Sequence, residues 1–152
     1  MAYVTSEARQ ELADSVADAA GELGTAVAAL GAAYEALDED SGDRLEEALF
    51  RPVQLAYGRA KKTATSFAER TGINVPPVSS RPEGPPSRGV KGYIEDASEA
   101  VFLAESILTE LQDSLSPVEV GDAELRAGLA DVRSRIEGIP GAAGAFVSRF
   151  GR

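Results

Sequence analysis

The residue types that most often carry catalysis are missing from this chain. The sequence contains no Cys and no His, which removes thiol nucleophiles, thiolate and imidazole metal ligands and the usual general base near neutral pH. A Ser or Thr nucleophile would have to use a lysine as its base, and no motif supports such a pairing with Lys61, Lys62 or Lys91. We therefore predict no catalytic residue and no enzyme activity.

Carboxylates are the remaining candidates for metal chemistry. Glu95, Asp96, Glu99 and Glu105 are close together in one predicted helix. Metal sites in helical bundles project into the core, whereas the helical spacing turns all of these residues except Glu105 outward. The sequence predicts a solvated acidic face, with no metal and no other cofactor.

The best local candidate for ligand binding is the segment from Ser87 to Gly92. It places Arg88, Gly89, Lys91 and Gly92 at the start of a predicted helix, where free amides and the helix dipole favour an anion. The segment matches neither the P-loop nor the dinucleotide-binding pattern. A flexible hinge is the simpler interpretation, and anion binding stays open as an alternative.

These residues must be positioned by helices. Apolar residues in the range 90–115 recur at alternating spacings of four and three, which is the pattern of one buried helical stripe. Similar stripes predict helices at about residues 6–37, 43–71, 88–115 and 117–150. We predict a single all-α domain over residues 1–152, an antiparallel four-helix up-down-up-down bundle built from two helical hairpins. The stripes consist of generic heptad residues and resemble no particular family.

A proline-rich linker at residues 72–89 joins the two predicted hairpins. It contains five of the eight prolines and cannot form a helix or a regular strand. As polyproline II it would reach roughly 50 Å, compared with about 39 Å for the third helix. A long crossover that makes the second and third helices parallel is therefore the alternative topology. The plain order is favoured because short loops join the other two helix pairs.

Several helix boundaries can also be predicted. Asp43 and Glu46 form a capping-box pattern at the start of the second helix, and Gly72 is a natural residue just past its end. Pro52 should cause a kink or a new start. The fourth helix should begin at Ser116 and Pro117, although Gly121 and Asp122 offer a second start. It is expected to continue past Pro140 with a bend.

The charge is distributed unevenly along the chain. The net charge is -10; residues 1–43 hold ten acidic and one basic residue, residues 44–91 four and nine, and residues 92–152 eleven and five. The overall acidity disfavours nucleic-acid binding. We predict that the basic second helix forms surface salt bridges with acidic neighbours, with the docking of an anionic partner as the alternative.

No targeting or membrane-spanning segment is evident in the sequence. The first residues lack the basic and apolar regions of a signal peptide, and the longest uncharged run, residues 23–34, is too short to span a bilayer. We therefore expect a cytoplasmic protein without integral membrane association. A weaker hypothesis is that residues 139–150, with Arg149 and Arg152, lie on a membrane surface.

Two sets of residues are candidates for a protein interface. The first is a small-residue surface on the first helix, made of Gly24, Ala28, Gly31 and Ala32. The second is the pair Phe102 and Leu103, which the helical register turns outward and which needs a cover, either the linker or a partner chain.

These surfaces predict a non-enzymatic interaction module, either a homodimer or an adaptor for another protein. The alternative is a small-ligand-binding bundle, with an apolar ligand in the core or an anion at the start of the third helix.

Overall fold

The computed structural model describes the backbone of residues 2–150 and the side chains of residues 4–150. Within this range every regular element is a helix and no strand occurs, which confirms the all-α class. The helices are α1 (Ala2–Ala36), α2 (Glu39–Leu45), the π-helical segment η1 (Glu46–Phe50), α3 (Arg51–Thr71), the 3₁₀ turn η2 (Pro86–Arg88), α4 (Gly89–Asp113), α5 (Ser116–Glu119), α6 (Ala123–Ile136) and α7 (Ile139–Phe150). None of these helices combines the length and the apolar character that crossing a bilayer requires.

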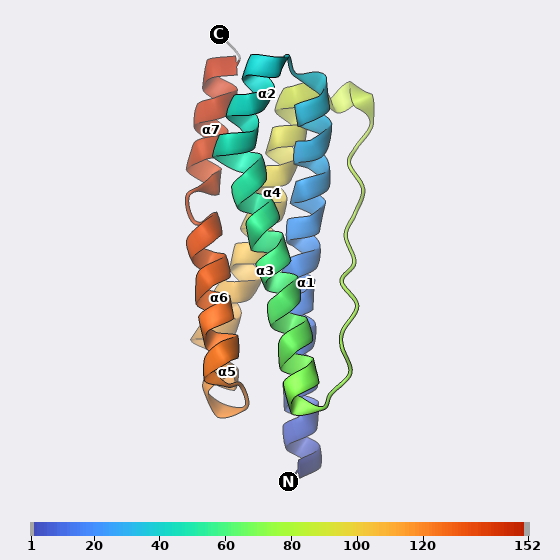
Figure 1. Cartoon of the computed structure of the whole chain (residues 1–152), viewed down its shortest axis with the longest axis vertical. Helices are drawn as coiled ribbons and strands as arrows, with labels where there is room; N and C mark the ends of the chain where they lie inside the picture. Colours follow the sequence, from blue (N-terminus) through green and yellow to red (C-terminus); the bar gives the residue numbers. More distant parts are fainter. Residues whose placement is uncertain (1, 151–152) are drawn as a thin grey trace.

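The helices form four long rods that lie side by side (Figure 1). The first rod is α1, the second is the continuous run of α2, η1 and α3, the third is α4, and the fourth is α6 followed by α7. α1 packs against α3 and α4, while the fourth rod also packs against α3 and α4. In cross-section the rods therefore make a square, with α3 and α4 on one diagonal and α1 and the fourth rod on the other.

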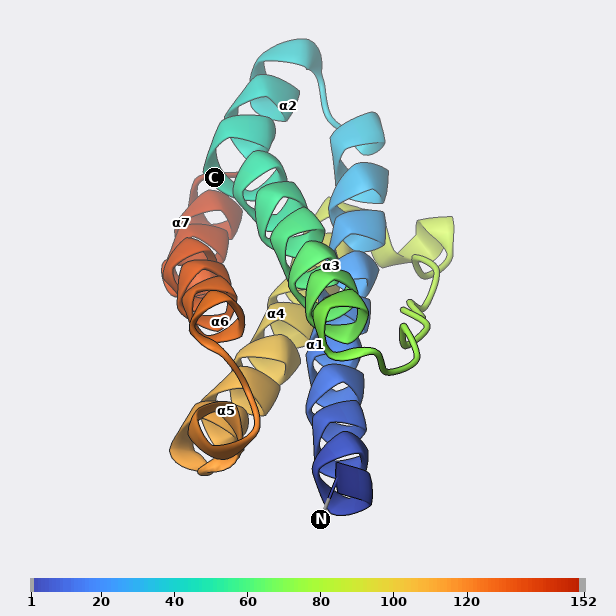
Figure 2. The ribbon, with the colours of Figure 1, turned by 60° about the horizontal axis from the view of Figure 1, so that its bottom comes forward.

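The linker between α3 and α4 runs the length of the bundle in the same direction as α1. Asn74 exchanges two hydrogen bonds with Gln10 near the start of α1, and the backbone amide of Arg81 donates to Thr25 Oγ1 further along it. Figures 1 and 2 both show the linker on the side of α1 away from α6 and α7. α4 therefore starts near the end of α1, and α3 and α4 run in the same direction.

The predicted up-down-up-down order is therefore wrong, and the chain adopts the long crossover. The physical reason is that the linker packs directly on α1. Gly21 and Gly24 have no side chain, so the backbone of Ser79 and the side chain of Ser80 can lie against the helix at these positions. The crossover connects α3 and α4, which are diagonal to each other and parallel. Every pair of adjacent rods is therefore still antiparallel, which is the arrangement that helix dipoles favour.

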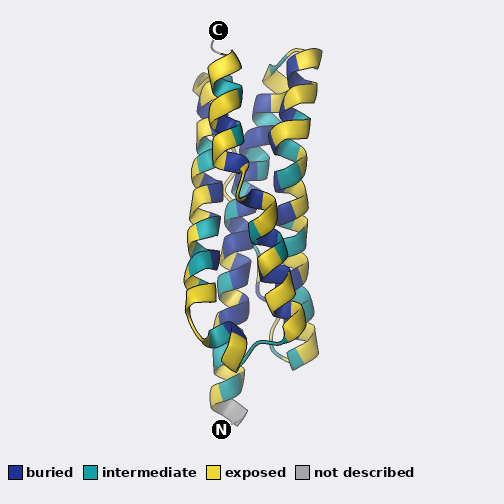
Figure 3. Cartoon of the chain, turned by 90° about the vertical axis from the view of Figure 1, so that its left-hand side faces the viewer, coloured by how far each residue is buried: buried dark blue, intermediate teal, exposed yellow. Residues whose placement is uncertain are grey.

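The apolar stripes form the core as predicted from their spacing. In α1 the predicted inward positions from Leu12 to Ala33 are buried, and in α4 those from Ile94 to Leu108 are buried. Figure 3 shows buried residues on the inner sides of the rods and exposed residues on their outer sides. Leu115 departs from its predicted place and is 67% exposed, because α4 ends at Asp113, before this residue can complete the stripe.

The second rod begins earlier than the sequence suggested. Asp38, and not Asp43, is the N-cap, since its carboxylate accepts a hydrogen bond of 2.8 Å from the amide of Ser41. The irregularity expected near Pro52 is present as the π-helical segment η1, in which the amide of Arg51 donates to the carbonyl of Glu46. A wider turn at this point accommodates a proline ring without ending the helix.

The predicted fourth helix, residues 117–150, is interrupted twice, so the prediction of one continuous helix is wrong, while the second start expected at Gly121 and Asp122 is the start of α6. A short loop follows α5, and Asp122 caps α6 by accepting a 2.8 Å hydrogen bond from the amide of Leu125. α6 ends at Ile136, and α7 starts at Ile139, with Pro140 at a position that needs no amide donor. The predicted bend at Pro140 is therefore a break, although Ile136 and Ile139 are both buried in the core.

Candidate functional site

The small-residue surface of α1 is largely covered by the chain itself. A Cβ atom added to Gly24 would collide with the Ser80 hydroxyl of the linker and would lie 2.9 Å from the Tyr57 ring. A Cβ atom at Gly21 would collide with the carbonyl oxygen of Ser79. The sequence argument that something packs on this face is correct, but Gly24 is not available to a second protein.

Hydrogen bonds and an ion pair fix the linker in this position. The guanidinium of Arg81 donates to both carboxylate oxygens of Glu22 at 3.0 Å, which raises the pKa of Arg81 above its ordinary value. The hydroxyl of Tyr93 in α4 lies within hydrogen-bond distance of the carbonyl oxygens of Gly84 (3.1 Å) and Pro85 (2.9 Å). The linker is therefore held along α1 and again where it enters α4.

The rest of the predicted α1 surface borders a groove. Ala28, Gly31 and Ala32 are partly buried and line a hollow of about 570 Å³ together with linker residues and Tyr93. These three positions thus lie at the edge of the linker. They do not form one surface with Phe102 and Leu103, which lie on the outer side of α4.

In the predicted anion site, both cations face carboxylates of the chain itself. Arg88 donates to the two carboxylate oxygens of Asp96 at 2.9 and 2.6 Å, which raises the pKa of Arg88. It also donates to the carbonyl of Gly92, and it covers that buried glycine. Lys91 Nζ lies 3.9 Å from Glu95, and Gly89 is exposed. The same contacts engage two of the four carboxylates considered as metal ligands, and residues 2–150 contain no group of three or more placed to hold a metal ion.

Phe102 and Leu103 lie on the outer face of α4, as the register predicted. Phe102 is 63% exposed and Leu103 38% exposed, and the linker contacts that cover α1 do not extend to Phe102. The exposed residues Glu95, Glu99 and Glu110 lie on the same outer face. We call this surface, made of Phe102, Leu103 and these three carboxylates, the α4 face.

Sequence reasoning missed a second outer surface, on α3. Leu55 is 52% exposed, and a Cβ atom added to Gly58 would meet nothing within 4 Å. Arg51 and Lys62 lie on the same helical stripe as these two residues and are also exposed. We call this surface, Arg51, Leu55, Gly58 and Lys62, the α3 face. The sequence did contain a signal for this surface. Val53 and Ala56 are the inward positions of the helix, so the register turns Leu55, which lies between them, outward.

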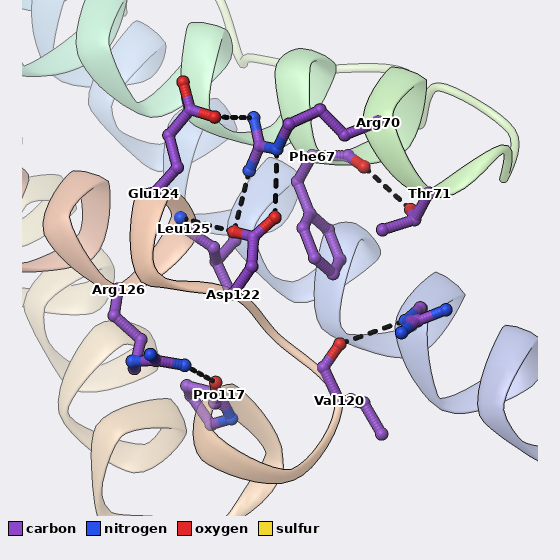
Figure 4. Close-up of polar contacts among 10 residues, drawn as sticks. Phe67, Arg70, Thr71, Pro117, Val120, Asp122, Glu124, Leu125 and Arg126 are labelled. Atoms are coloured by element: carbon purple, nitrogen blue, oxygen red, sulfur yellow. Dashed lines mark hydrogen bonds and ion pairs between the residues drawn. The ribbon is translucent and has the colours of Figure 1, made fainter.

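Ion pairs join the basic α3 to acidic residues of α6, which confirms that expectation for two arginines. Arg59 lies 3.1 Å from Asp131, and Arg70 lies 2.8 Å from both Asp122 and Glu124 (Figure 4). The hydrogen bond from Arg70 lowers the pKa of Asp122, which also caps α6. Nearby, Arg9 donates to the carbonyl of Val120 at 3.1 Å. The contacts of Arg70 and Arg9 hold the end of α3 and the start of α1 against the start of α6. They involve no residue of the α3 face or the α4 face.

Sequence reasoning also missed a groove at the other end of the bundle. It has a volume of about 810 Å³ and lies between α2 with η1 on one side and α7 on the other. Arg44, Arg149, Phe146 and Phe150 are among its lining residues, and the two phenyl rings stack with their centroids 6.4 Å apart. Arg149 makes no ion pair within residues 4–150, while Arg152, the other basic residue of the predicted membrane-surface tail, lies outside the described residues.

A comparison of the chain with protein-family models, with curated proteins and with solved structures finds no match. The function of the chain is therefore inferred from its own residues.

Proposed function

We propose that this chain is a non-enzymatic protein that binds another protein chain through the α4 face. The observation that carries the proposal is the exposure of Phe102, which is 63% exposed while the stripe on the inner side of the same helix is buried. Burying a phenyl group of this kind contributes about 1.5–3 kcal/mol. Exposed aromatic residues that are surrounded by polar groups are typical centres of protein interfaces.

The charge around Phe102 indicates the character of the partner. Glu95, Glu99 and Glu110 are exposed on the same face, so a partner with basic residues around an apolar contact is favoured electrostatically. The absence of Cys is compatible with a reducing compartment, and we propose that the interaction takes place in the cytoplasm, between two copies or with another protein.

The proposal can be tested by placing a photo-crosslinking amino acid at single exposed positions in the cells that express the gene. p-Benzoylphenylalanine at position 102 should give a covalent adduct with a second protein chain. The matched control is the same residue in place of Ala127, which is exposed on α6 and should give no such adduct. No adduct at position 102, or the same adducts at both positions, would overturn the proposal.

A second candidate function is favoured by the groove of about 810 Å³ between α2, η1 and α7. Phe146 and Phe150 offer an apolar contact, and Arg44 and Arg149 offer positive charge at its edge. This combination suits an amphipathic anion with an acyl chain. Native mass spectrometry with oleate as the probe should show a complex with a one-to-one stoichiometry that Arg149→Ser weakens, and equal binding by both proteins would exclude this candidate.

A further inference from the structure

The α3 and α4 faces lie on opposite sides of the molecule. Figure 1 shows α3 in front of the bundle and α4 behind it, with α1 and the fourth rod on the two flanks. The linker lies along α1 and borders the α4 face only at Glu99, which lines a groove with Arg81 and Pro82, while Phe102 stays exposed. The two faces are also at the same height, because Tyr57 lies over Gly24 of α1 and the next α1 residue, Thr25, lines one groove with Ala100 of α4.

The two faces carry opposite charges. On α4 the exposed outer charges are Glu95, Glu99, Glu110 and Asp113, with the single base Lys91 at one end. On α3 they are Arg51 and Lys62, with the single acid Glu69 at the other end. Each face has an exposed apolar side chain in its middle, Phe102 on α4 and Leu55 on α3. A negative face and a positive face, each with an exposed apolar side chain, are complementary in charge, and the open Cβ position of Gly58 leaves space for an aromatic ring beside Leu55.

We propose that the partner of the α4 face is the α3 face of a second copy of this chain, with Phe102 seated on Gly58 beside Leu55. The inference rests on the proposed function, since it identifies the chain that the α4 face binds. We take the helices at the contact to be antiparallel, the direction that brings Glu69, Arg51 and Lys62 opposite residues of the other sign. Glu69 lies eleven residues after Gly58 and Lys91 eleven before Phe102, so the two residues face each other.

The same register pairs the remaining charges. Arg51 lies seven residues before Gly58, and Glu110 lies eight after Phe102, so they meet at the opposite end of the contact. Lys62, four residues after Gly58, meets Glu99, three before Phe102. Asp113 lies beyond the last of these pairs and faces Glu47 of η1, whereas in the parallel direction it would face Glu69. The internal pairs that must rearrange, Arg51 with Glu46 and Lys91 with Glu95, are exposed and long, at 3.5 and 3.9 Å, and such pairs contribute little.

A contact between two different faces cannot close a symmetric dimer. A pair of copies uses one α3 face and one α4 face and leaves the other two free, so further copies can add. Because α3 and α4 are parallel within one chain, an antiparallel contact turns each copy end over end relative to the previous one. One helix against one helix buries less than the ~800 Å² per partner of a standard interface, so the association should depend strongly on protein and salt concentration.

The first experiment is sedimentation equilibrium of the purified chain over a wide concentration range at low salt. The average mass should rise from 15.8 kDa to more than twice that value and should fall again when salt is added. Gly58→Gln and Phe102→Ser should each weaken association by at least about tenfold, the loss expected when one well-packed contact is removed. Gly58→Gln also replaces an exposed helical glycine by a better helix former, so folding is not at risk.

Two matched controls should associate as the unchanged chain does. Gly144→Gln places the same side chain at a glycine of α7 whose Cβ position is also open. Val118→Ser removes another exposed apolar side chain, which is 69% exposed at a different end of the bundle. These controls separate the loss of the contact from a general change in surface polarity.

The decisive experiment mixes the two defective variants. Gly58→Gln retains its α4 face and Phe102→Ser retains its α3 face, so an equimolar mixture should form one-to-one dimers that grow no further. A wild-type chain that stays monomeric, or a Gly58→Gln protein that still associates, overturns the inference. In that case a position-102 crosslink to a different protein would leave the proposed function standing, whereas no crosslink would overturn both.

Discussion

The contact between the end of α3 and the start of α6 predicts a specific, pH-dependent loss of stability when Asp122 is changed. Asp122 caps α6 through the amide of Leu125 at 2.8 Å and accepts 2.9 and 2.8 Å hydrogen bonds from Arg70. Loss of an N-cap costs about 1 kcal/mol, and a partly exposed charge-assisted pair adds up to about 1 kcal/mol. Asp122→Ala should therefore lower the free energy of unfolding by about 1–2 kcal/mol.

The pH dependence distinguishes the two contributions. The pKa of Asp122 is lowered in the folded chain, chiefly by the hydrogen bond from Arg70. The ionised carboxylate therefore stabilises the fold above its unfolded pKa, near 3.8, and this contribution is lost as the pH falls through the lower folded pKa. Asp122→Asn keeps the cap but removes the charge, so its loss of stability should be smaller at pH 7 and should disappear in acid.

Urea denaturation followed by circular dichroism at pH 7 and in steps below pH 4 measures both effects. Asp18→Asn, at an exposed position of α1, is the matched control and should be nearly neutral at every pH. If Asp122→Asn were as damaging as Asp122→Ala at pH 7, or if its effect persisted unchanged at the lowest pH, the assignment of the stabilisation to the Arg70 ion pair would be refuted.

Three further predictions concern the linker, the core and the charges of the two faces. Gly24→Ala should displace Ser80 and Tyr57 and speed proteolysis of the linker several-fold, while Gly138→Ala, at an open position, should not; equal cleavage rates would contradict the linker path. Gly128→Ala should cost about 1–3 kcal/mol in urea denaturation, because its Cβ would collide with Thr63; an unchanged midpoint would show that the close approach of α6 to α3 is not required. Lys62→Glu should reduce self-association, and adding Glu99→Lys should restore it, which sedimentation of the single and double variants can check.

The helices could be predicted because a buried stripe has the same spacing wherever a helix packs. The positions from Leu12 to Ala33 and from Ile94 to Leu108 are buried as the spacing required. Boundaries were less predictable when two signals competed. Asp43 with Glu46 is a good capping pattern, but Asp38 already caps the helix. The apolar spacing continues past Pro140, but the spacing alone does not show whether the helix itself is continuous.

The order of the rods could not be predicted, because it depends on where the linker lies. The length of the linker allowed both topologies, and the choice depends on contacts between residues far apart in sequence, such as Gln10 with Asn74. The carboxylate contacts of the candidate anion site could not be predicted for a similar reason. Arg88 and Asp96 are two helical turns apart, and the sequence does not show that the arginine folds back over Gly92 to reach the carboxylate. Leu55 was missed because a lone exposed leucine is common on protein surfaces.

The crossover also determines which surfaces remain open. By lying along α1, the linker covers part of the small-residue face that the sequence indicated as an interface. The outer sides of α3 and α4 stay exposed on opposite sides of the square. Had the plain up-down-up-down order formed, α3 and α4 would have been adjacent and antiparallel, and their opposite charges could have paired within one molecule. In the observed order they are diagonal, so the outer charges of α3 and those of α4 cannot pair with each other within one molecule. The topology therefore leaves these charges available for the contact between copies that we propose.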